Sequence, residues 1–135
     1  MHSSSVDRLS AKGRMILVVD DEPFILQYVG QVLRQACYEV MTAANGDQAW
    51  SILEQKQIHL VLTDIIMPGA LDGLGLAKKI RDKHLSIPVL FITGAVPEGD
   101  DRTAELVSNG FLLRKPFFPK QLLDFIGTRF THSSS

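Results

Sequence analysis

The sequence predicts an α/β fold: a doubly wound, five-stranded parallel sheet with helices on both of its faces. Two observations predict it. Five short apolar runs rich in β-branched residues recur along the 135-residue chain, and a helical spacing of apolar residues follows each run. Alternation of this kind is typical of a parallel sheet covered by helices. The predicted strands span residues 14–19, 38–43, 58–63, 87–93 and 111–113.

The polarity of the runs predicts the order of the strands. Runs 14–19 and 58–63 are mostly apolar, which is typical of strands buried on both faces. Run 38–43 alternates polar and apolar residues and therefore belongs at an edge. Because right-handed crossovers leave few topologies, we expect the order 2-1-3-4-5. Its switch point lies between strands 1 and 3, and ligands are expected outside the carboxyl ends of these strands.

The helices are predicted from capping signals and from apolar residues that share one helix face. The first helix is expected to start in the acidic run 20–23, where Asp can cap and Pro tolerates an early position. Further helices are expected from Asp47, over residues 74–83 and, with a weaker pattern, over about 100–109. The last helix has an apolar face made of Leu122, Leu123, Phe125, Ile126 and Phe130.

Composition and charge exclude several classes of protein. The 14 Lys and Arg residues are balanced by 15 Asp and Glu, so the basic excess of a nucleic-acid-binding protein is absent. The apolar runs are far shorter than the roughly 20 residues of a bilayer span, and no signal peptide is visible. One cysteine, Cys37, leaves no internal disulfide and favours a reducing, cytoplasmic location. We expect it to be a small packed residue near the end of the first helix.

Polar side chains stand where the predicted strands end. Asp20 and Asp21 follow strand 1, Asp64 follows strand 3, Thr93 ends strand 4 and Lys115 follows strand 5. Because the carboxyl ends of parallel strands share one edge of a sheet, we expect these side chains to converge. Strands 1 and 3 are expected to be neighbours, about 5 Å apart, which brings three carboxylates together.

The three carboxylates expected at this edge repel one another, so either one takes a proton or a cation neutralises the set. Their ligand atoms are all oxygens, which favours a hard divalent ion, most simply Mg²⁺. No His or Cys belongs to the cluster, which disfavours Zn²⁺. His59, for example, is expected at the start of strand 3, the opposite end of the sheet.

An acidic metal site beside a lysine and a hydroxyl indicates phosphoryl chemistry. Mg²⁺ and Lys115 can neutralise charge on phosphoryl oxygens, and Thr93 can donate a hydrogen bond to one of them. Asp64 is the best candidate for a nucleophile that forms an aspartyl phosphate, because it stands alone on the central strand.

Five short segments carry a resemblance to a known family: VVDDE at 18–22, LTDIIMP at 62–68, DG at 72–73, ITG at 92–94 and RKPF at 114–117. Together they resemble the receiver domain of two-component response regulators. Each segment alone is a weak signal, whereas their joint occurrence at predicted strand ends is specific. The resemblance covers residues 14–131 as one domain and leaves 1–13 and 132–135 as polar tails. It implies the CheY-like form of the flavodoxin-like fold.

The resemblance also assigns roles to the acidic residues. It implies that Asp64 is the phosphoacceptor, which takes the group from a histidine kinase or a histidine phosphotransfer protein. Asp21 resembles the direct Mg²⁺ ligand of the family, and Asp20 resembles the residue that acts largely through water. The backbone carbonyl of Ile66 would complete the protein ligands.

For the remaining two site residues the resemblance implies a switch. Thr93 matches the hydroxyl that moves toward the phosphoryl group, and Lys115 matches the lysine that contacts it, followed by a cis peptide bond at Lys115–Pro116. Phosphorylation would then shift the face formed by helix 100–109, the fifth strand and the last helix. Such a domain assists its own phosphorylation and dephosphorylation and is not expected to be an enzyme.

Three features depart from the family pattern. Leu112 occupies the position of the usual switch aromatic, with Phe111 one residue earlier, so whether an aromatic switch operates here stays open. The loop before residues 72–73 is one residue longer than usual. Gly94 stands where alanine is commoner. None of these departures removes a phosphorylation residue.

Three alternatives remain beside this interpretation. A Mg²⁺-dependent phosphatase with an Asp nucleophile usually needs a second carboxylate nearby, but Ile66 stands two residues after Asp64. A flavin carrier would need a phosphate-binding loop after strand 1, where this chain has acids. A receiver-like module that is never phosphorylated is the third. The chain ends with the last helix, so we expect a stand-alone receiver or one from a larger protein such as a hybrid histidine kinase.

Overall fold

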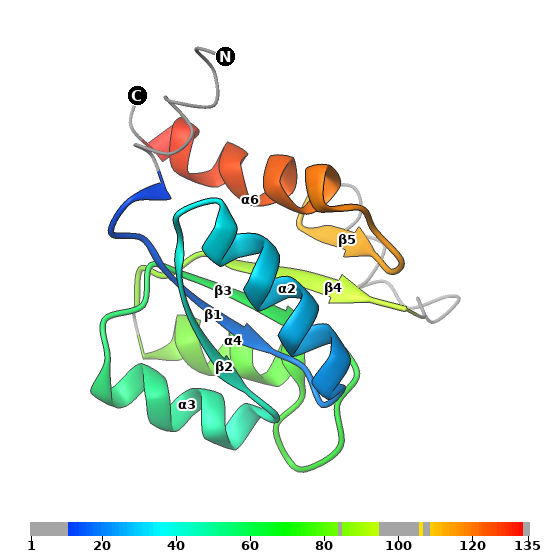
Figure 1. The fold of residues 1–135 in the computed structure, drawn as a ribbon. Helices are drawn as coiled ribbons and strands as arrows, with labels where there is room; N and C mark the ends of the chain where they lie inside the picture. The colour runs from blue at the N-terminus through cyan, green and yellow to red at the C-terminus, as the bar shows by residue number, and fades with distance from the viewer. Residues whose placement is uncertain (1–10, 84, 95–105, 107–108, 134–135) are drawn as a thin grey trace.

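The computed structural model describes residues 11–83, 85–94, 106 and 109–133 and has a parallel sheet between two layers of helices (Figure 1). The strands are β1 (Met15–Val19), β2 (Glu39–Ala43), β3 (Leu60–Asp64), β4 (Val89–Thr93) and β5 (Leu112–Arg114). The helices assigned within the described residues are α2 (Pro23–Gln35), α3 (Gly46–Gln55), α4 (Gly73–Asp82) and α6 (Pro119–Ser133). The predicted α/β fold is confirmed.

The strands pair in parallel in the order β2-β1-β3-β4-β5, which confirms the order that run polarity predicts. The central strand β3 is buried at every position, whereas the edge strand β2 is mostly exposed or half-buried. In the register of the sheet, Val19 lies beside Thr63 and Asp64 lies beside Ile92. The carboxyl ends of β1, β3 and β4 therefore meet at one edge.

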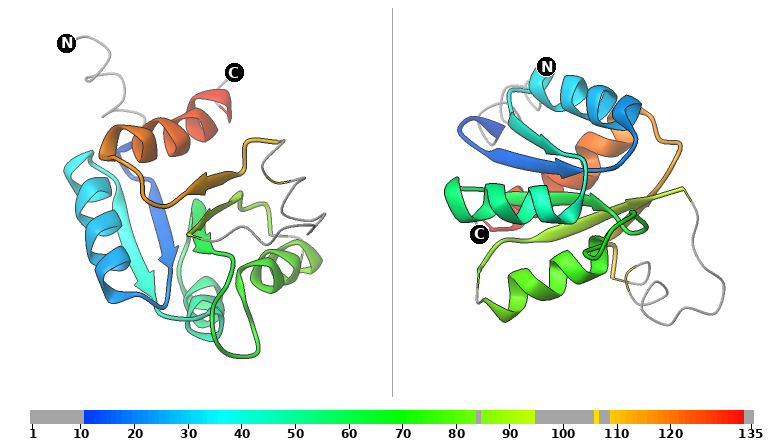
Figure 2. Two further views of the ribbon diagram at one scale, coloured as in Figure 1. Left: turned by 90° about the vertical axis from the view of Figure 1, so that its right-hand side faces the viewer. Right: turned by 90° about the horizontal axis from the view of Figure 1, so that it is seen from below.

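The sheet is covered on both faces, as a doubly wound fold requires. α2 and α6 pack on one face and α3 and α4 on the other (Figures 1 and 2). The alternation of side chains along β1 serves both layers: Ile16 and Val18 face α2 and α6, while Leu17 and Val19 face α3 and α4. Burial of β1 between two apolar layers explains why its sequence is continuously apolar.

Part of the prediction falls outside the described residues. Only residues 106 and 109 of the helix predicted over about 100–109 are described, as are only residues 11–13 of the tail 1–13. Within the described part of the chain, no helix combines the length and the apolar character that a membrane span needs.

The boundaries of the strands differ from the predicted ones by one or two residues. β3 includes Asp64, because the ladder continues through its pairing with Ile92. β5 spans Leu112–Arg114 instead of residues 111–113. The shift follows from the pairing of Thr93 with Arg114, which extends the β4–β5 ladder toward the carboxyl edge.

The first helix starts in the run 20–23, as predicted, but the side chain of its N-cap residue makes no capping hydrogen bond. The N-cap of α2 is Glu22, and Pro23 occupies the first helical position. Asp20 accepts a hydrogen bond of 2.9 Å from the Glu22 backbone N–H instead. Asp20 thus uses Oδ1 at the start of α2, while its Oδ2 contacts Lys115 at the edge of the sheet. In contrast, Asp72 caps α4 by accepting from the Gly75 N–H at 2.8 Å.

The prediction that Cys37 packs as a small buried residue is wrong. Cys37 is exposed and has a φ of 77°, the left-handed conformation that usually favours glycine. The Cys37 N–H donates to the Arg34 carbonyl, and the Tyr38 N–H donates to the Leu33 carbonyl. This pattern terminates α2, so Cys37 takes the position after the helix where the chain reverses.

Candidate functional site

Two buried aspartates occupy neighbouring strand ends. Asp20 follows β1, and its backbone N–H donates to the Ala43 carbonyl at 3.1 Å. Asp64 is the last residue of β3, and its Oδ1 accepts from the Ile66 N–H at 3.2 Å. Both residues are buried: Asp20 is 0% exposed and Asp64 is 6% exposed. One carboxylate oxygen of each residue is thus held by a backbone N–H, and the other is directed at a cation.

That cation is Lys115, which follows β5. Its Nζ lies 2.8 Å from Asp20 Oδ2, 3.0 Å from Asp64 Oδ2 and 3.3 Å from Glu22 Oε1. The Lys115 side chain is 11% exposed, so most of these contacts are shielded from water. The Lys115–Pro116 peptide bond is cis, as expected. The convergence of strand ends predicted from the parallel sheet is therefore present.

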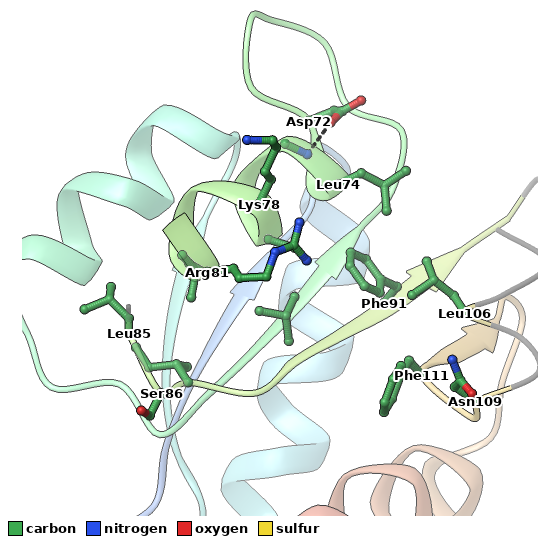
Figure 3. Close-up of a pocket in the computed structure, with 15 residues that line it drawn as sticks. Asp72, Leu74, Lys78, Arg81, Leu85, Ser86, Phe91, Leu106, Asn109 and Phe111 are labelled. Atoms are coloured by element: carbon green, nitrogen blue, oxygen red, sulfur yellow. Dashed lines mark hydrogen bonds between the residues drawn. The ribbon is translucent and has the colours of Figure 1, made fainter. Parts of the chain in front are cut away.

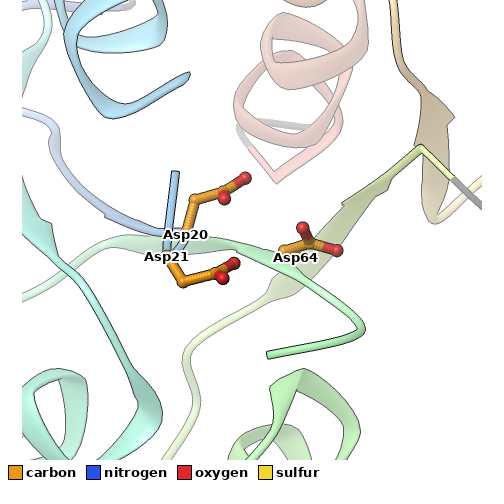
Figure 4. Close-up of side chains that lie close together, drawn as sticks. All are labelled: Asp20, Asp21 and Asp64. Carbon is orange, nitrogen blue, oxygen red and sulfur yellow. The ribbon is translucent and has the colours of Figure 1, made fainter. Parts of the chain in front are cut away.

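The third aspartate completes a cluster of possible metal ligands. Asp21 is exposed, beside the two buried carboxylates. One carboxylate oxygen of Asp20, one of Asp21 and one of Asp64 all lie within 4.8 Å of one another (Figure 4). Close carboxylates with only oxygen ligands are suited to a hard divalent cation. The arrangement fits a metal of the Mg²⁺ type.

The protonation equilibria reflect the crowding of charge. Burial raises the pKa of Asp20 above its ordinary value, although the Lys115 ammonium and the Glu22 N–H oppose this by stabilising the carboxylate. Burial by itself lowers the pKa of Lys115, but the hydrogen bonds to Asp20 and Asp64 outweigh it and hold the pKa above its ordinary value. Lys115 is therefore a permanently charged counter-ion for two buried carboxylates.

Thr93 ends β4 beside this cluster and is 1% exposed. Its carbonyl accepts from the Lys115 N–H at 2.8 Å, which extends the β4–β5 ladder. The preceding residue, Ile92, is paired with Asp64 in the sheet. Thr93 therefore directly follows Ile92, the residue of β4 that pairs with the phosphoacceptor candidate Asp64.

Comparison with known proteins agrees with this geometry. Residues 16–127 match the response regulator receiver domain family. The chain belongs to this family. Among curated relatives, it is 38% identical over 110 residues to "Probable transcriptional regulator ycf27" of Cyanophora paradoxa and 34% identical over 108 residues to "Regulatory protein VanR" of Enterococcus faecium. These matches cover 81% and 80% of this chain but 45% and 46% of the relatives.

A solved structure supports the same assignment. The CheY-like response regulator receiver domain protein of Methanospirillum hungatei JF-1 superposes with a TM-score of 0.78 at 26% identity. The superposition covers 90% of this chain and 96% of that one. The function predicted from the sequence, a receiver domain of two-component signalling, is confirmed at this level. The chain spans less than half the length of the curated relatives named above.

The longer loop of this receiver domain packs against two glycines. A Cβ atom at Gly73 would overlap the carbonyl oxygen of Asp64, and one at Gly46 would overlap the carbonyl oxygen of Leu71. The Gly73 N–H also donates to the Ile65 carbonyl at 3.0 Å. The loop therefore returns to the end of β3, and glycine at position 73 is required for this close approach.

The other two departures from the family pattern, at Gly94 and at Phe111–Leu112, involve only ordinary contacts. A Cβ atom at Gly94 would meet only Lys115 Cδ, at 3.9 Å, an ordinary contact. Phe111 is half-buried, with the Arg129 guanidinium 4.3 Å from its ring centre. Leu112 is half-buried and pairs with Phe91. An alanine at position 94 would fit this arrangement.

A cavity among the described residues lies elsewhere in the receiver domain. It has a volume of about 950 Å³ and lies between α4, β4 and Phe111, which precedes β5 (Figure 3). Phe91, Ile80 and Phe111 give it apolar walls, and Lys78 and Arg81 line it from α4. Asp20, Asp21, Asp64 and Lys115 are not among the residues that line it, so the acid cluster is a separate site.

Two residues near Lys115 were not predicted as site residues from the sequence. Glu22 contacts Lys115 Nζ, and Tyr28 contacts Phe117, which follows the cis peptide bond. The position of Glu22, directly after two site acids, is a signal that could have found it. Tyr28 lies 89 residues from Phe117 and carries no local signal.

Proposed function

We propose that this receiver domain accepts a phosphoryl group on Asp64 from a histidine kinase or a histidine phosphotransfer protein, with Mg²⁺ as cofactor. One observation carries the proposal. Lys115 Nζ contacts both Asp20 and Asp64 beside three carboxylates whose ligand atoms lie within 4.8 Å of one another. A nucleophile, metal ligands and a fixed cation in one place are what phosphoryl transfer by positioning and charge compensation needs.

Among the three carboxylates, Asp64 is best placed to be the nucleophile. Asp20 has no exposed surface, so a donor cannot reach it, whereas Asp64 retains 6% exposure at the edge of the sheet. In the transfer, an Asp64 carboxylate oxygen forms the new bond to phosphorus. The bond between phosphorus and the donor's imidazole nitrogen breaks, and its electron pair stays on that nitrogen.

Asp20, Asp21, Asp64 and the backbone carbonyl of Ile66 are proposed to hold Mg²⁺. The set offers only oxygen ligands, and exposed Asp21 leaves room for a hydrated ion to approach. When bound, Mg²⁺ would neutralise charge on the carboxylates and on the phosphoryl oxygens.

Lys115 and Thr93 are proposed to convert phosphorylation into a change of surface. A phosphoryl group adds negative charge at Asp64, within reach of the Lys115 ammonium that already contacts this carboxylate at 3.0 Å. The Lys115–Thr93 backbone hydrogen bond links the ends of β4 and β5. A difference in affinity between two arrangements of these strand ends would shift the face that includes β5 and α6.

The domain is proposed to be a phosphoacceptor that assists its own reactions, and not an enzyme with a separate substrate. A phosphatase is not favoured, because Ile66 supplies no general acid two residues after Asp64. A cytoplasmic location is proposed with it, since a single cysteine suits a reducing compartment. With a net charge of -1, direct contact with nucleic acid is not part of the proposal.

Incubation with acetyl phosphate and Mg²⁺, followed by intact mass measurement, tests the proposal. Wild-type protein should gain one phosphoryl group, and Asp64→Asn should gain none. Asp124→Asn is the matched control, since Asp124 pairs with Lys120 on the exposed side of α6, and it should behave as wild type. Equal uptake by wild type and Asp64→Asn would reject the assignment of Asp64.

A further inference from the structure

The segment that carries Lys115 is held at both ends by hydrogen bonds to other elements. On the side of β5, the Lys115 N–H donates to the Thr93 carbonyl at 2.8 Å. On the side of α6, the Phe117 carbonyl accepts a hydrogen bond of 3.1 Å from the Tyr28 hydroxyl. The position of the Lys115 backbone therefore depends on β4 at one end and on α2 at the other.

Tyr28 makes a second contact with the same segment. Its ring centre lies 6.0 Å from that of Phe117, with the rings tilted by 38°. The Phe117 side chain is 8% exposed and belongs to the apolar layer beneath α2 and α6. Phe117 is thus fixed by its side chain in the core and by its carbonyl at Tyr28, two residues after Lys115.

The Tyr28 contact adds to a contact from the start of the same helix. Glu22, the N-cap of α2, lies 3.3 Å from Lys115 Nζ, so α2 touches this segment at the ammonium and at the backbone. The Glu22 side chain is 59% exposed, and such ion pairs contribute little in water. Tyr28 is 36% exposed, but its hydrogen bond is to the carbonyl of a residue whose side chain is buried, and it is held together with a ring contact.

We propose that Tyr28 is a positioning residue for Lys115: through the Phe117 carbonyl it fixes the segment from which the ammonium reaches the phosphoryl group. The inference rests on the proposed function of Asp64. Tyr28 touches none of the three aspartates in the contacts described, so its effect falls on the phosphoryl group and not on the metal. Because the lysine side chain is long and flexible, loss of Tyr28 weakens this contact and does not abolish it.

The chain offers a matched control, since it has two tyrosines. Tyr38 precedes β2 at the amino end of the sheet, is 8% exposed and has its ring centre 5.8 Å from that of Phe130. Tyr28→Phe and Tyr38→Phe each remove one hydroxyl and keep the ring. The two variants therefore separate a contact near Lys115 from the general effect of losing a tyrosine hydroxyl.

The test measures two dissociation constants for each protein: that of Mg²⁺ alone, and that of beryllofluoride at saturating Mg²⁺, followed by fluorine NMR. Tyr28→Phe should weaken beryllofluoride binding about three- to tenfold, the effect of one lost hydrogen bond, and leave Mg²⁺ binding unchanged. Tyr38→Phe should change neither constant. In a Lys115→Met background, Tyr28→Phe should have no further effect, because Tyr28 acts through the lysine.

Two results would overturn the positioning role. One is beryllofluoride binding by Tyr28→Phe that equals wild type or falls together with Mg²⁺ binding. The other is a loss that persists in the Lys115→Met background. If wild-type protein binds no beryllofluoride, the proposed function of Asp64 fails and the inference fails with it. If wild type binds and Lys115→Met weakens binding while Tyr28→Phe does not, only the role of Tyr28 is lost.

Discussion

The two ends of the central sheet provide partners for their polar groups in different ways. At the amino end, the Met15 N–H donates to His59 Nδ1 at 2.9 Å, and a backbone group meets an imidazole. At the carboxyl end, Asp20 and Asp64 are buried with their charges and share one ammonium, that of Lys115. Taking like charges out of water is costly, so the arrangement at the carboxyl end is explained by chemistry and not by stability.

Removal of the cation should give the largest effect and should do so only at the carboxyl end. Lys115→Met leaves the buried carboxylates without their counter-ion and should lower the free energy of unfolding by about 3 kcal/mol. Urea unfolding in Mg²⁺-free buffer measures this loss, and added Mg²⁺ should reduce it.

Lys120→Met is the control for this prediction. Lys120 forms an ion pair with Asp124 on the surface of α6, and its removal should leave the unfolding curve unchanged. Equal losses for the two lysines would contradict the view that Lys115 compensates a buried cluster.

The second effect concerns the loop that returns to the end of β3. Gly73→Ala places a methyl group on the carbonyl oxygen of Asp64 and should destabilise the protein by about 2 kcal/mol and slow phosphoryl uptake. Gly94→Ala meets only Lys115 Cδ at 3.9 Å and should be tolerated. Thermal unfolding and acetyl phosphate labelling of both variants compare them. Wild-type stability and labelling of Gly73→Ala would contradict this prediction, because they would show that a methyl group fits beside the Asp64 carbonyl oxygen.

A smaller effect is expected at the amino end. His59→Ala removes the acceptor of the Met15 N–H and should cost about 1 kcal/mol in the free energy of unfolding. Calorimetric titration of this variant with Mg²⁺ should give the wild-type dissociation constant, and its labelling by acetyl phosphate should be normal. Impaired Mg²⁺ binding by His59→Ala would contradict the view that the amino end does not affect the site at the carboxyl end.

The smallest effect is a pH dependence that belongs to the carboxyl end. Burial raises the pKa of folded Asp20 above 3.8, so between the two values the folded state holds a proton that the unfolded state has released. Without Mg²⁺, the stability contributed by this group should therefore increase as pH falls through the raised pKa. Lys115 stays charged in both states over this range and adds no slope.

Comparison with Asp20→Asn isolates this term. The difference in unfolding free energy between wild type and Asp20→Asn, followed from about pH 7 to about pH 4, should shift in favour of wild type as pH falls. A flat difference, or one that shifts in favour of the variant, would contradict the raised pKa.

The features that the sequence predicts correctly are those that depend on topology. Run polarity is enough to place β2 at the edge and β3 at the centre. Parallel strands then bring Asp20, Asp64 and Lys115 to one edge, although Lys115 lies 95 residues from Asp20. No knowledge of side-chain contacts is needed, because the position of each residue at a strand end already fixes its place.

The features that the sequence does not predict depend on local backbone conformation and on which distant residues individual side chains contact. Cys37 is exposed because the termination of α2 puts it in a left-handed position, and the residue type gives no sign of this. Asp20 accepts from the Glu22 N–H with one oxygen and contacts Lys115 with the other, and the second partner is distant in sequence. The contact of Tyr28 with Phe117 follows from the packing of α2 beside the segment between β5 and α6, which local patterns do not encode.

The central claim is that the charged carboxyl end exists to carry a phosphoryl group on Asp64. Borohydride reduction after incubation with acetyl phosphate and Mg²⁺ tests it most directly, since it converts an aspartyl phosphate to homoserine at the residue that carried the group. Peptide mass spectrometry should find homoserine at position 64 and aspartate at positions 20 and 21. Homoserine at position 20 or 21, or intact aspartate at all three positions, would contradict the claim.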